Sequence, residues 1–232
     1  MTKLIFLGTK GEIEEFNEKH RYHASLLLIV DSIRLLIDYG KRRRYTLEEL
    51  RPDAIFITHA HPDPYAWLDE AIETTVPVYL TQDTYDYGKY HPSNAHIIRP
   101  GQEIRIGNIF VTAYRVIHSI RCPTVGFRLI VGEKTLVYNP DLVDIVEKEK
   151  ILSGVDYYIG DGSSIRANLV RRRGDQLFGH TRITTQINWC RDYHIFNVVF
   201  THLGKETLEK EVELQRLHPD VILAYDGMEK EI

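Results

Sequence analysis

Cysteine is scarce in this sequence, which has only Cys122 and Cys190 among 232 residues. Two isolated cysteines form neither the paired spacing of a zinc ribbon nor the framework of a disulfide-rich secreted domain. We therefore expect both to be small buried side chains in a reduced, cytoplasmic protein.

Long apolar runs and a strong net charge are also missing. No stretch approaches the ~18 to 20 apolar residues that a membrane-spanning helix requires, and the apolar run at residues 4–7 is too short for a signal peptide. The 29 lysine and arginine residues and 33 acidic residues give a net charge of −4. We expect no membrane partner and no global basic surface, although local basic patches remain open.

Repeats, linkers and low-complexity segments are absent, so the sequence predicts a single domain over residues 1–232. The first half is rich in strands and hairpins, whereas the second half alternates strands with helices, including a charged helix at 205–217. This mixture predicts an α/β fold, a four-layer αββα sandwich of two mixed β-sheets packed face to face with helices outside.

The most informative stretch is Thr58-His59-Ala60-His61-Pro62-Asp63-Pro64. It follows a predicted buried strand at 54–57, and residues 64–72 predict a helix with Asp63 as its N-cap. The one-residue spacing lets both imidazoles turn toward one ion, and a carboxylate suits harder ions. The alternative is a polar turn in which Asp63 only caps a helix.

Three further candidates each follow a predicted strand, namely His118, Asp141 and His202. Strand ends in a layered α/β fold gather at one edge, so we expect these side chains to meet His59 and His61 there. Taken singly, the histidines could be structural and Asp141 could belong to a turn. Taken together, they predict a metal site.

Other polar residues could support such a site. His180 follows a glycine and precedes a predicted helix at 184–192, so it is a candidate general acid or substrate ligand, or else a helix-entry residue. Asp161 and Asp226 also follow predicted strands. Either could hold a ligand imidazole in orientation, or serve in a turn or cap.

At these residues the chain resembles the metallo-β-lactamase-fold superfamily of metal-dependent hydrolases. The family pattern is Thr-His-x-His-x-Asp-His, followed by a lone His, a bridging Asp and a final His. The resemblance covers essentially the full length and includes Leu-Gly-Thr at 7–9, the turn at 37–40 and Tyr-Asp-Gly-Met at 225–228. Within the superfamily, the chain looks closest to the branch with ribonuclease Z-like and phosphodiesterase-like proteins.

The resemblance implies two adjoining metal positions, with His59, His61 and His118 at the first, Asp63 and His202 at the second, and Asp141 as the bridge. Residue 64 departs from the two-metal pattern, because it is proline where the family has histidine. The first position keeps the tri-histidine set of a catalytic zinc. The second keeps two carboxylates and one imidazole. The number of bound ions, one or two, is therefore open, and so is their identity, which could be zinc, manganese or iron.

The resemblance implies hydrolysis by a metal-activated water, which Asp63 could orient or deprotonate. Arg171, Arg172 and Arg173 suit phosphate, or form a solvated loop; with the family branch they favour a nucleic-acid or small phosphodiester substrate. The alternatives are hydrolysis of a lactone, thioester or amide, a mononuclear iron oxygenase, and a metal-binding protein without catalysis. Whether the chain forms a homodimer stays open.

Overall fold

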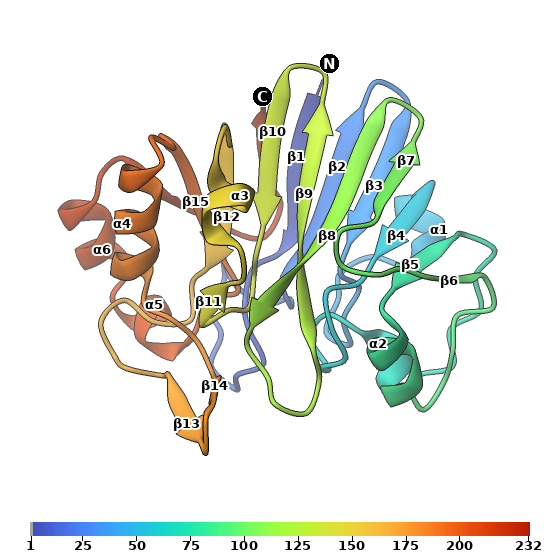
Figure 1. The fold of residues 1–232 in the computed structure, drawn as a ribbon, viewed down its shortest axis with the longest axis horizontal. Helices are drawn as coiled ribbons and strands as arrows, with labels where there is room; N and C mark the ends of the chain where they lie inside the picture. Colours follow the sequence, from blue (N-terminus) through green and yellow to red (C-terminus); the bar gives the residue numbers. More distant parts are fainter. Residues whose placement is uncertain (1) are drawn as a thin grey trace.

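Two large mixed sheets form the centre of the protein (Figure 1). The computed structural model describes residues 2–232; Met1, the first residue of the expected domain, lies outside them. The seven-stranded sheet has the order β17 (Met228–Glu231), β1 (Thr2–Gly8), β2 (Ser25–Val30), β3 (Ile33–Ile37), β4 (Ala54–Phe56), β5 (Val78–Leu80) and β6 (Ala95–Ile97). The eight-stranded sheet has the order β11 (Asp144–Ile145), β8 (Ile109–Ile117), β9 (Thr124–Val131), β10 (Lys134–Tyr138), β12 (Tyr157–Asp161), β15 (Asn197–Thr201) and β16 (Val221–Leu223), with β7 (Glu103–Ile106) paired to β8.

The side chains of β8 show how the two sheets pack. Val111 and Ala113 point into an apolar layer that also contains Leu4 and Leu28 from the other sheet. Val116, on the opposite face, joins a second apolar cluster beneath the helices. Because side chains alternate along a strand, β8 contributes side chains to both apolar layers.

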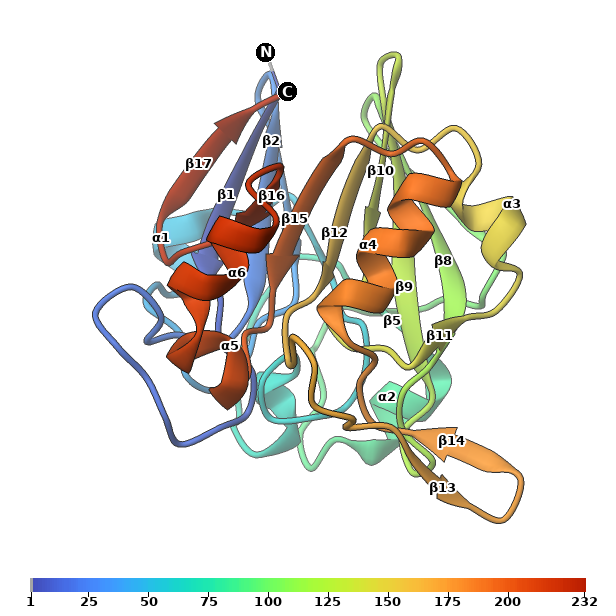
Figure 2. The same ribbon diagram turned by 90° about the vertical axis from the view of Figure 1, so that its left-hand side faces the viewer.

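Helices cover the outer face of each sheet (Figure 2). Those over the eight-stranded sheet are α3 (Lys148–Leu152), α4 (Ile183–Asp192), α5 (Lys205–Glu209) and α6 (Glu211–Leu217). The shorter elements on the other side are α1 (Leu47–Leu50), the 3₁₀ turn η1 (Ala66–Leu68) and α2 (Gln82–Tyr87). The predicted α/β fold class, with two mixed sheets and outer helices, is confirmed. Among residues 2–232, no helix combines the length and apolarity that crossing a bilayer requires.

Two local predictions were wrong. The expected helix at 64–72 is only the short turn η1, because the Tyr39 N–H donates to the Pro64 carbonyl and draws this segment alongside the end of β3. The expected helix at 205–217 is divided into α5 and α6 at Lys210, whose backbone leaves the helical conformation at φ −121°.

A small hairpin stands apart from both sheets. It consists of β13 (Arg171–Arg173) and β14 (Gln176–Phe178), and Figure 2 shows it projecting at the same end of the molecule as α2. The arginine-rich stretch that the sequence suggested as a phosphate-binding segment is therefore an exposed strand rather than a loop.

Candidate metal centre

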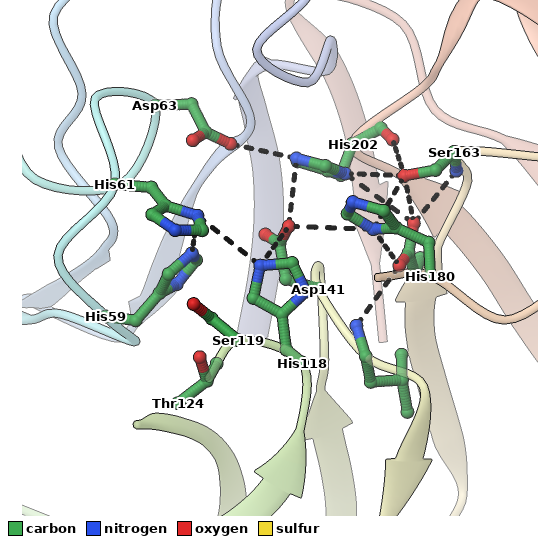
Figure 3. Close-up of polar contacts among 12 residues, drawn as sticks. His59, His61, Asp63, His118, Ser119, Thr124, Asp141, Ser163, His180 and His202 are labelled. Atoms are coloured by element: carbon green, nitrogen blue, oxygen red, sulfur yellow. Dashed lines mark hydrogen bonds and ion pairs between the residues drawn. The ribbon is translucent and has the colours of Figure 1, made fainter. Parts of the chain in front are cut away.

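The predicted ligands meet at one edge of the sandwich (Figure 3). Each follows a strand, so the sheets fix the loops that hold them: β4 precedes the His-x-His-x-Asp loop, and β8, β10 and β15 precede the others. The ligand atoms form two tight groups, His59 with His61 and His118, and Asp63 with Asp141 and His202. Within each group, all of the ligand atoms lie within 4.8 Å of one another.

The three histidines of the first group face a common point. His61 Nδ1 lies 2.9 Å from His59 Nε2 and 3.4 Å from His118 Nε2. A tetrahedral zinc with Zn–N bonds of ~2.05 Å separates its nitrogens by roughly 3.3 Å. The three rings are mutually inclined by 73–75°, which lets them approach one centre without stacking. This donor set therefore fits a zinc ion.

The other ring nitrogens of His59 and His118 are occupied, which fixes their tautomers. His118 Nδ1 donates to the Gly179 carbonyl at 3.0 Å, and His59 Nδ1 lies 3.0 Å from the Thr58 hydroxyl. Burial lowers the pKa of His118 to about 3 and that of His59 well below its usual value. Both imidazoles are thus neutral at pH 7, with an Nε2 lone pair available for a cation.

The second group places the His202 imidazole between two carboxylates. His202 Nε2 lies 2.8 Å from Asp63 Oδ2 and 3.2 Å from Asp141 Oδ1. Burial opposes protonation of His202, but the carboxylates of Asp141, Asp161 and Asp63 together outweigh it and raise the His202 pKa well above its usual value. Asp141 is the link between the groups, because the same Oδ1 lies 3.5 Å from His118 Nε2. Its pKa is raised by burial to about 7.

A chain of hydrogen bonds orients His202. It includes Ser163, which the sequence analysis did not identify. Ser163 Oγ donates to Asp161 Oδ1 at 2.5 Å, and His202 Nδ1 lies 3.0 Å from the same hydroxyl. The His202 Nδ1–H is therefore engaged, and Nε2 points at Asp63 and Asp141. Ser163 lies two residues after Asp161, at the end of β12, and that position was the only available signal for it.

Replacing Ser163 with alanine should loosen this imidazole. We expect Ser163→Ala to weaken metal binding by roughly 10- to 100-fold, the usual cost of losing a hydrogen bond behind a metal ligand. Competition with a chromogenic chelator measures this loss. Ser153→Ala is the matched control, since its exposed hydroxyl only bonds the Glu149 carbonyl in α3. Equal metal affinity in the Ser163→Ala variant and the parent would contradict this role.

Asp38 holds the metal-binding loop at its base. Its carboxylate accepts from the Thr58 N–H at 2.8 Å and from the Thr58 hydroxyl at 3.0 Å. The Thr58 carbonyl in turn accepts from the Val125 N–H, on β9 of the other sheet, at 3.1 Å. The residue before His59 is thus bonded to both sheets.

Two glycines permit close approach at the site. A Cβ on Gly40 would lie 1.6 Å from the Asp63 carbonyl oxygen, and a Cβ on Gly11 would lie 2.8 Å from His202 Cε1. Only glycine lets these two segments pack so tightly against the ligands.

His180 lies beside the two ligand groups, at the more open side of the centre. His180 Nδ1 lies 2.8 Å from Asp161 Oδ2 and 3.8 Å from Asp141 Oδ1. Burial lowers its pKa, but the charge and hydrogen bond of Asp161, together with the Asp141 charge, outweigh burial, so the pKa is raised overall. Its side chain is 23% exposed, and its Nε2 makes no hydrogen bond within residues 2–232.

Asp226 lies elsewhere. Its carboxylate accepts from the Thr9 hydroxyl and from the backbone N–H groups of Arg21 and Tyr22, so it holds the loop after β1. Within the described part of the chain, it bonds none of the ligand imidazoles. The expected orienting role therefore falls to Asp161, which reaches His202 through Ser163.

The three arginines of β13 do not line the cavity over the metal ligands. That cavity, of about 470 Å³, is bounded instead by residues such as Glu12, Lys205 and Glu206 beside the ligands. The Arg172 guanidinium bonds the Gly174 carbonyl and lies 3.7 Å from Asp175. A phosphate-binding role for Arg171, Arg172 and Arg173 stays a prediction.

Comparison with known proteins agrees with this geometry. The family model described as the beta-lactamase superfamily domain matches residues 34–203. The ribonuclease Z of Methanopyrus kandleri is 31% identical over 275 aligned residues, covering 96% of this chain and 95% of that protein. A diphosphatase of the PhnP family superposes with a TM-score of 0.74 at 18% identity, covering 100% of this chain and 98% of that one. The short form of human tRNase Z superposes with a TM-score of 0.71 at 18% identity, covering 99% of each chain. The chain belongs to the metallo-β-lactamase-fold superfamily of metal-dependent hydrolases.

Proposed function

We propose that this protein is a metal-dependent phosphodiesterase that uses a metal-activated water. The observation that carries the proposal is the pair of adjoining ligand groups bridged by Asp141, with the Asp161–His180 pair beside them. A two-part site of this kind can hold both the attacking and the leaving oxygens of a phosphoryl group. The similarity to a ribonuclease Z, an enzyme that cleaves RNA, supports a phosphodiester over other esters.

The roles of the chain's residues follow from their positions. A bound zinc ion would supply a Lewis acid that lowers the pKa of water toward ~7. Asp63 orients the attacking water and, where no second ion holds it, takes the water proton. As the water oxygen bonds to phosphorus and the bond to the leaving oxygen breaks, His180 gives a proton to that oxygen. Asp161 favours the protonated form of His180 and engages its Nδ1, which leaves Nε2 for the leaving oxygen.

Zinc is the ion we assign to the tri-histidine group, because three neutral imidazoles with an open fourth position are typical of catalytic zinc. The second group offers two carboxylates and one imidazole, so it should bind an ion more weakly and accept manganese. Iron in the first group would instead favour oxygenase chemistry.

Assays on matched esters test the proposal. Protein purified without added metal is analysed for its elements, then assayed on bis(p-nitrophenyl) phosphate and on panels of lactones, thioesters and amides. Preference for the phosphodiester supports the proposal. Preference for another panel makes the protein a different hydrolase, and bound iron with oxygen consumption makes it an oxygenase. Stoichiometric metal without turnover on any substrate would leave a metal-binding protein.

Pro64→His should restore the second metal position. Residue 64 follows Asp63 directly, and the family places an imidazole there. We expect the metal-to-protein ratio to rise toward two, as measured by elemental analysis after dialysis against limiting zinc. Pro62→His, two residues earlier in the same loop, is the matched control. An unchanged ratio in Pro64→His would count against proline as the cause of a weak second position.

If β13 contacts phosphate substrates, Arg172→Ala should weaken their binding and leave the binding of uncharged substrates unchanged. A guanidinium at an exposed phosphate contact is worth roughly a severalfold change in KM. The test compares KM for bis(p-nitrophenyl) phosphate with KM for whichever uncharged ester is also turned over. Arg191→Ala, on the outer helix α4, is the control. An equal loss on every substrate would remove the phosphate argument for β13.

A further inference from the structure

A second cavity adjoins the metal centre and is not explained by the hydrolytic residues. This groove, of about 770 Å³, shares His118 with the metal cavity and continues past Ser119 and Thr124 toward α2, β6 and the β13–β14 hairpin. Figure 3 draws Ser119 and Thr124 next to His118, the residue that lines both cavities. Its volume suits a nucleotide-sized group and not a folded macromolecule.

Two arginines on one wall of the groove lack acidic partners. Arg99 and Arg115 line it, and neither guanidinium has a carboxylate within 4.0 Å among residues 2–232. The Gly101 N–H bonds the Ala113 carbonyl at 2.8 Å, which places the segment containing Arg99 beside the strand that contains Arg115. Two unpaired guanidiniums on neighbouring stretches create a local positive potential that an anion would relieve.

Acidic residues also line the groove, but they do not neutralise the positive charge of Arg99 and Arg115. Asp175 belongs to the hairpin and lies 3.7 Å from the Arg172 guanidinium, so its charge already has a partner. Asp83 lies in the first turn of α2, on a different segment from the two arginines. The arginine wall is thus the part of the groove that attracts a negative charge.

Aliphatic side chains form another part of the lining. Ile97, Val146 and Leu177 are large apolar side chains that line the groove and remain 41%, 39% and 40% exposed. They come from three separate elements, β6, the segment after β11, and the hairpin strand β14. Among residues 2–232, no phenylalanine, tyrosine or tryptophan lines the groove, so it is not a platform for stacking successive bases. It can bury the sugar and one face of a single nucleoside.

The distance between the arginine wall and the metal centre suits a flanking phosphate. Arg115 precedes His118 by three residues at the end of β8, and a strand rise of ~3.3 Å per residue separates their backbones by roughly 10 Å. An arginine side chain can span much of that distance. A nucleoside with one phosphate at the metal ligands would therefore direct its other phosphate toward Arg99 and Arg115.

We infer that this groove binds the nucleoside next to the scissile bond and that Arg99 and Arg115 bind its second phosphate. The substrate is then a phosphodiester flanked by a further phosphate, such as a short single-stranded nucleotide chain. This inference rests on the proposed phosphodiesterase function, and it specifies which phosphodiesters that site prefers.

Binding of a matched pair of nucleotides tests the inference without turnover. Isothermal titration calorimetry compares thymidine 3′,5′-bisphosphate with thymidine 5′-monophosphate on the metal-loaded protein. Charged hydrogen bonds to the added phosphate should make the bisphosphate bind roughly 10- to 100-fold more tightly. In the double variant Arg99→Gln/Arg115→Gln the ratio should fall toward one. Arg191→Gln on α4 should keep the ratio of the parent protein.

Kinetics on a second matched pair complete the test. The p-nitrophenyl ester of thymidine 5′-monophosphate and its 3′-phosphorylated form contain the same scissile bond and reporter group. The 3′-phosphate should lower KM and leave kcat similar, and the double variant should lose this difference. Leu177→Ser should weaken the binding of both nucleotides equally. Phe196 is an exposed apolar residue outside the groove, so Phe196→Ser should leave the binding of both unchanged.

Each failure has a distinct meaning. Equal binding of the two nucleotides by the parent, or a ratio that survives in the double variant, overturns the groove inference even if phosphodiesters are hydrolysed. A preference for the bisphosphate that depends on the arginines supports the groove inference even if no phosphodiester is turned over, in which case the proposed function alone fails. Circular dichroism melting of each variant confirms that it is folded.

Discussion

His61→Ala should strip the metal from the tri-histidine group and remove nearly all of the hydrolytic activity. Its Nδ1 lies between the other two imidazoles, 2.9 Å from one and 3.4 Å from the other, so no neighbour can replace it. Loss of several kcal/mol of Lewis-acid stabilisation corresponds to roughly a thousandfold decrease in kcat/KM, at ~1.36 kcal/mol per tenfold. Elemental analysis of the purified variant measures the metal, and bis(p-nitrophenyl) phosphate measures the activity.

A control separates this loss from general damage. His96→Ala removes an exposed imidazole that only bonds Asn94 and stacks on Tyr79, so it should keep the metal content and activity of the parent. A His61→Ala protein that still contains as much metal as the parent would refute the assignment of the tri-histidine group.

His180→Ala should affect substrates according to their leaving groups. A p-nitrophenolate leaves without a proton, whereas the sugar alkoxide of thymidylyl-(3′,5′)-thymidine needs one. We expect kcat to fall roughly 10²- to 10⁴-fold on the dinucleotide, the usual contribution of a positioned general acid, and much less on bis(p-nitrophenyl) phosphate. Asp161→Asn should show the same selectivity to a smaller extent, because Asp161 bonds His180, and it should also weaken metal binding, because Asp161 supports His202 through Ser163.

Metal content distinguishes this role from that of a ligand. His180→Ala should retain the parent's metal-to-protein ratio if His180 acts as a proton donor, although its ring nitrogen also lies close enough to Asp141 and His118 to bind an ion. A loss of metal with equal effects on both substrates would instead make His180 a ligand. His194→Ala, on the turn after α4, is the matched control for an imidazole outside the centre.

Much of the metal centre could be predicted because its residues follow strands. His118, Asp141 and His202 each come shortly after an apolar run, and apolar runs of this kind are the most readable part of a sequence. Their common position at the end of a strand was enough to bring them together with His59 and His61. His180 joined them as a candidate on weaker grounds, since only its place before a helix marked it.

Other features depended on contacts that sequence patterns do not contain. The segment at 64–72 has the composition of a helix start, but the bond between Tyr39 and Pro64 overrides that preference. The hairpin at 171–178 contains charged residues with no apolar alternation, so it resembled a loop. Ser163 is an ordinary serine until folding places its hydroxyl between Asp161 and His202. The single domain, the cytoplasmic location and the metal identity remain predictions.

The origin of the ligands has a consequence for folding. His59, His61 and Asp63 follow a strand of the seven-stranded sheet, whereas His118, Asp141 and His202 follow strands of the eight-stranded sheet. An ion at either position would therefore clamp the two halves of the sandwich across their shared apolar layer. Because such a clamp exists only in the native state, its binding free energy adds to the free energy of unfolding. Starving a cell of metal would then lower the amount of intact protein as well as its catalytic rate.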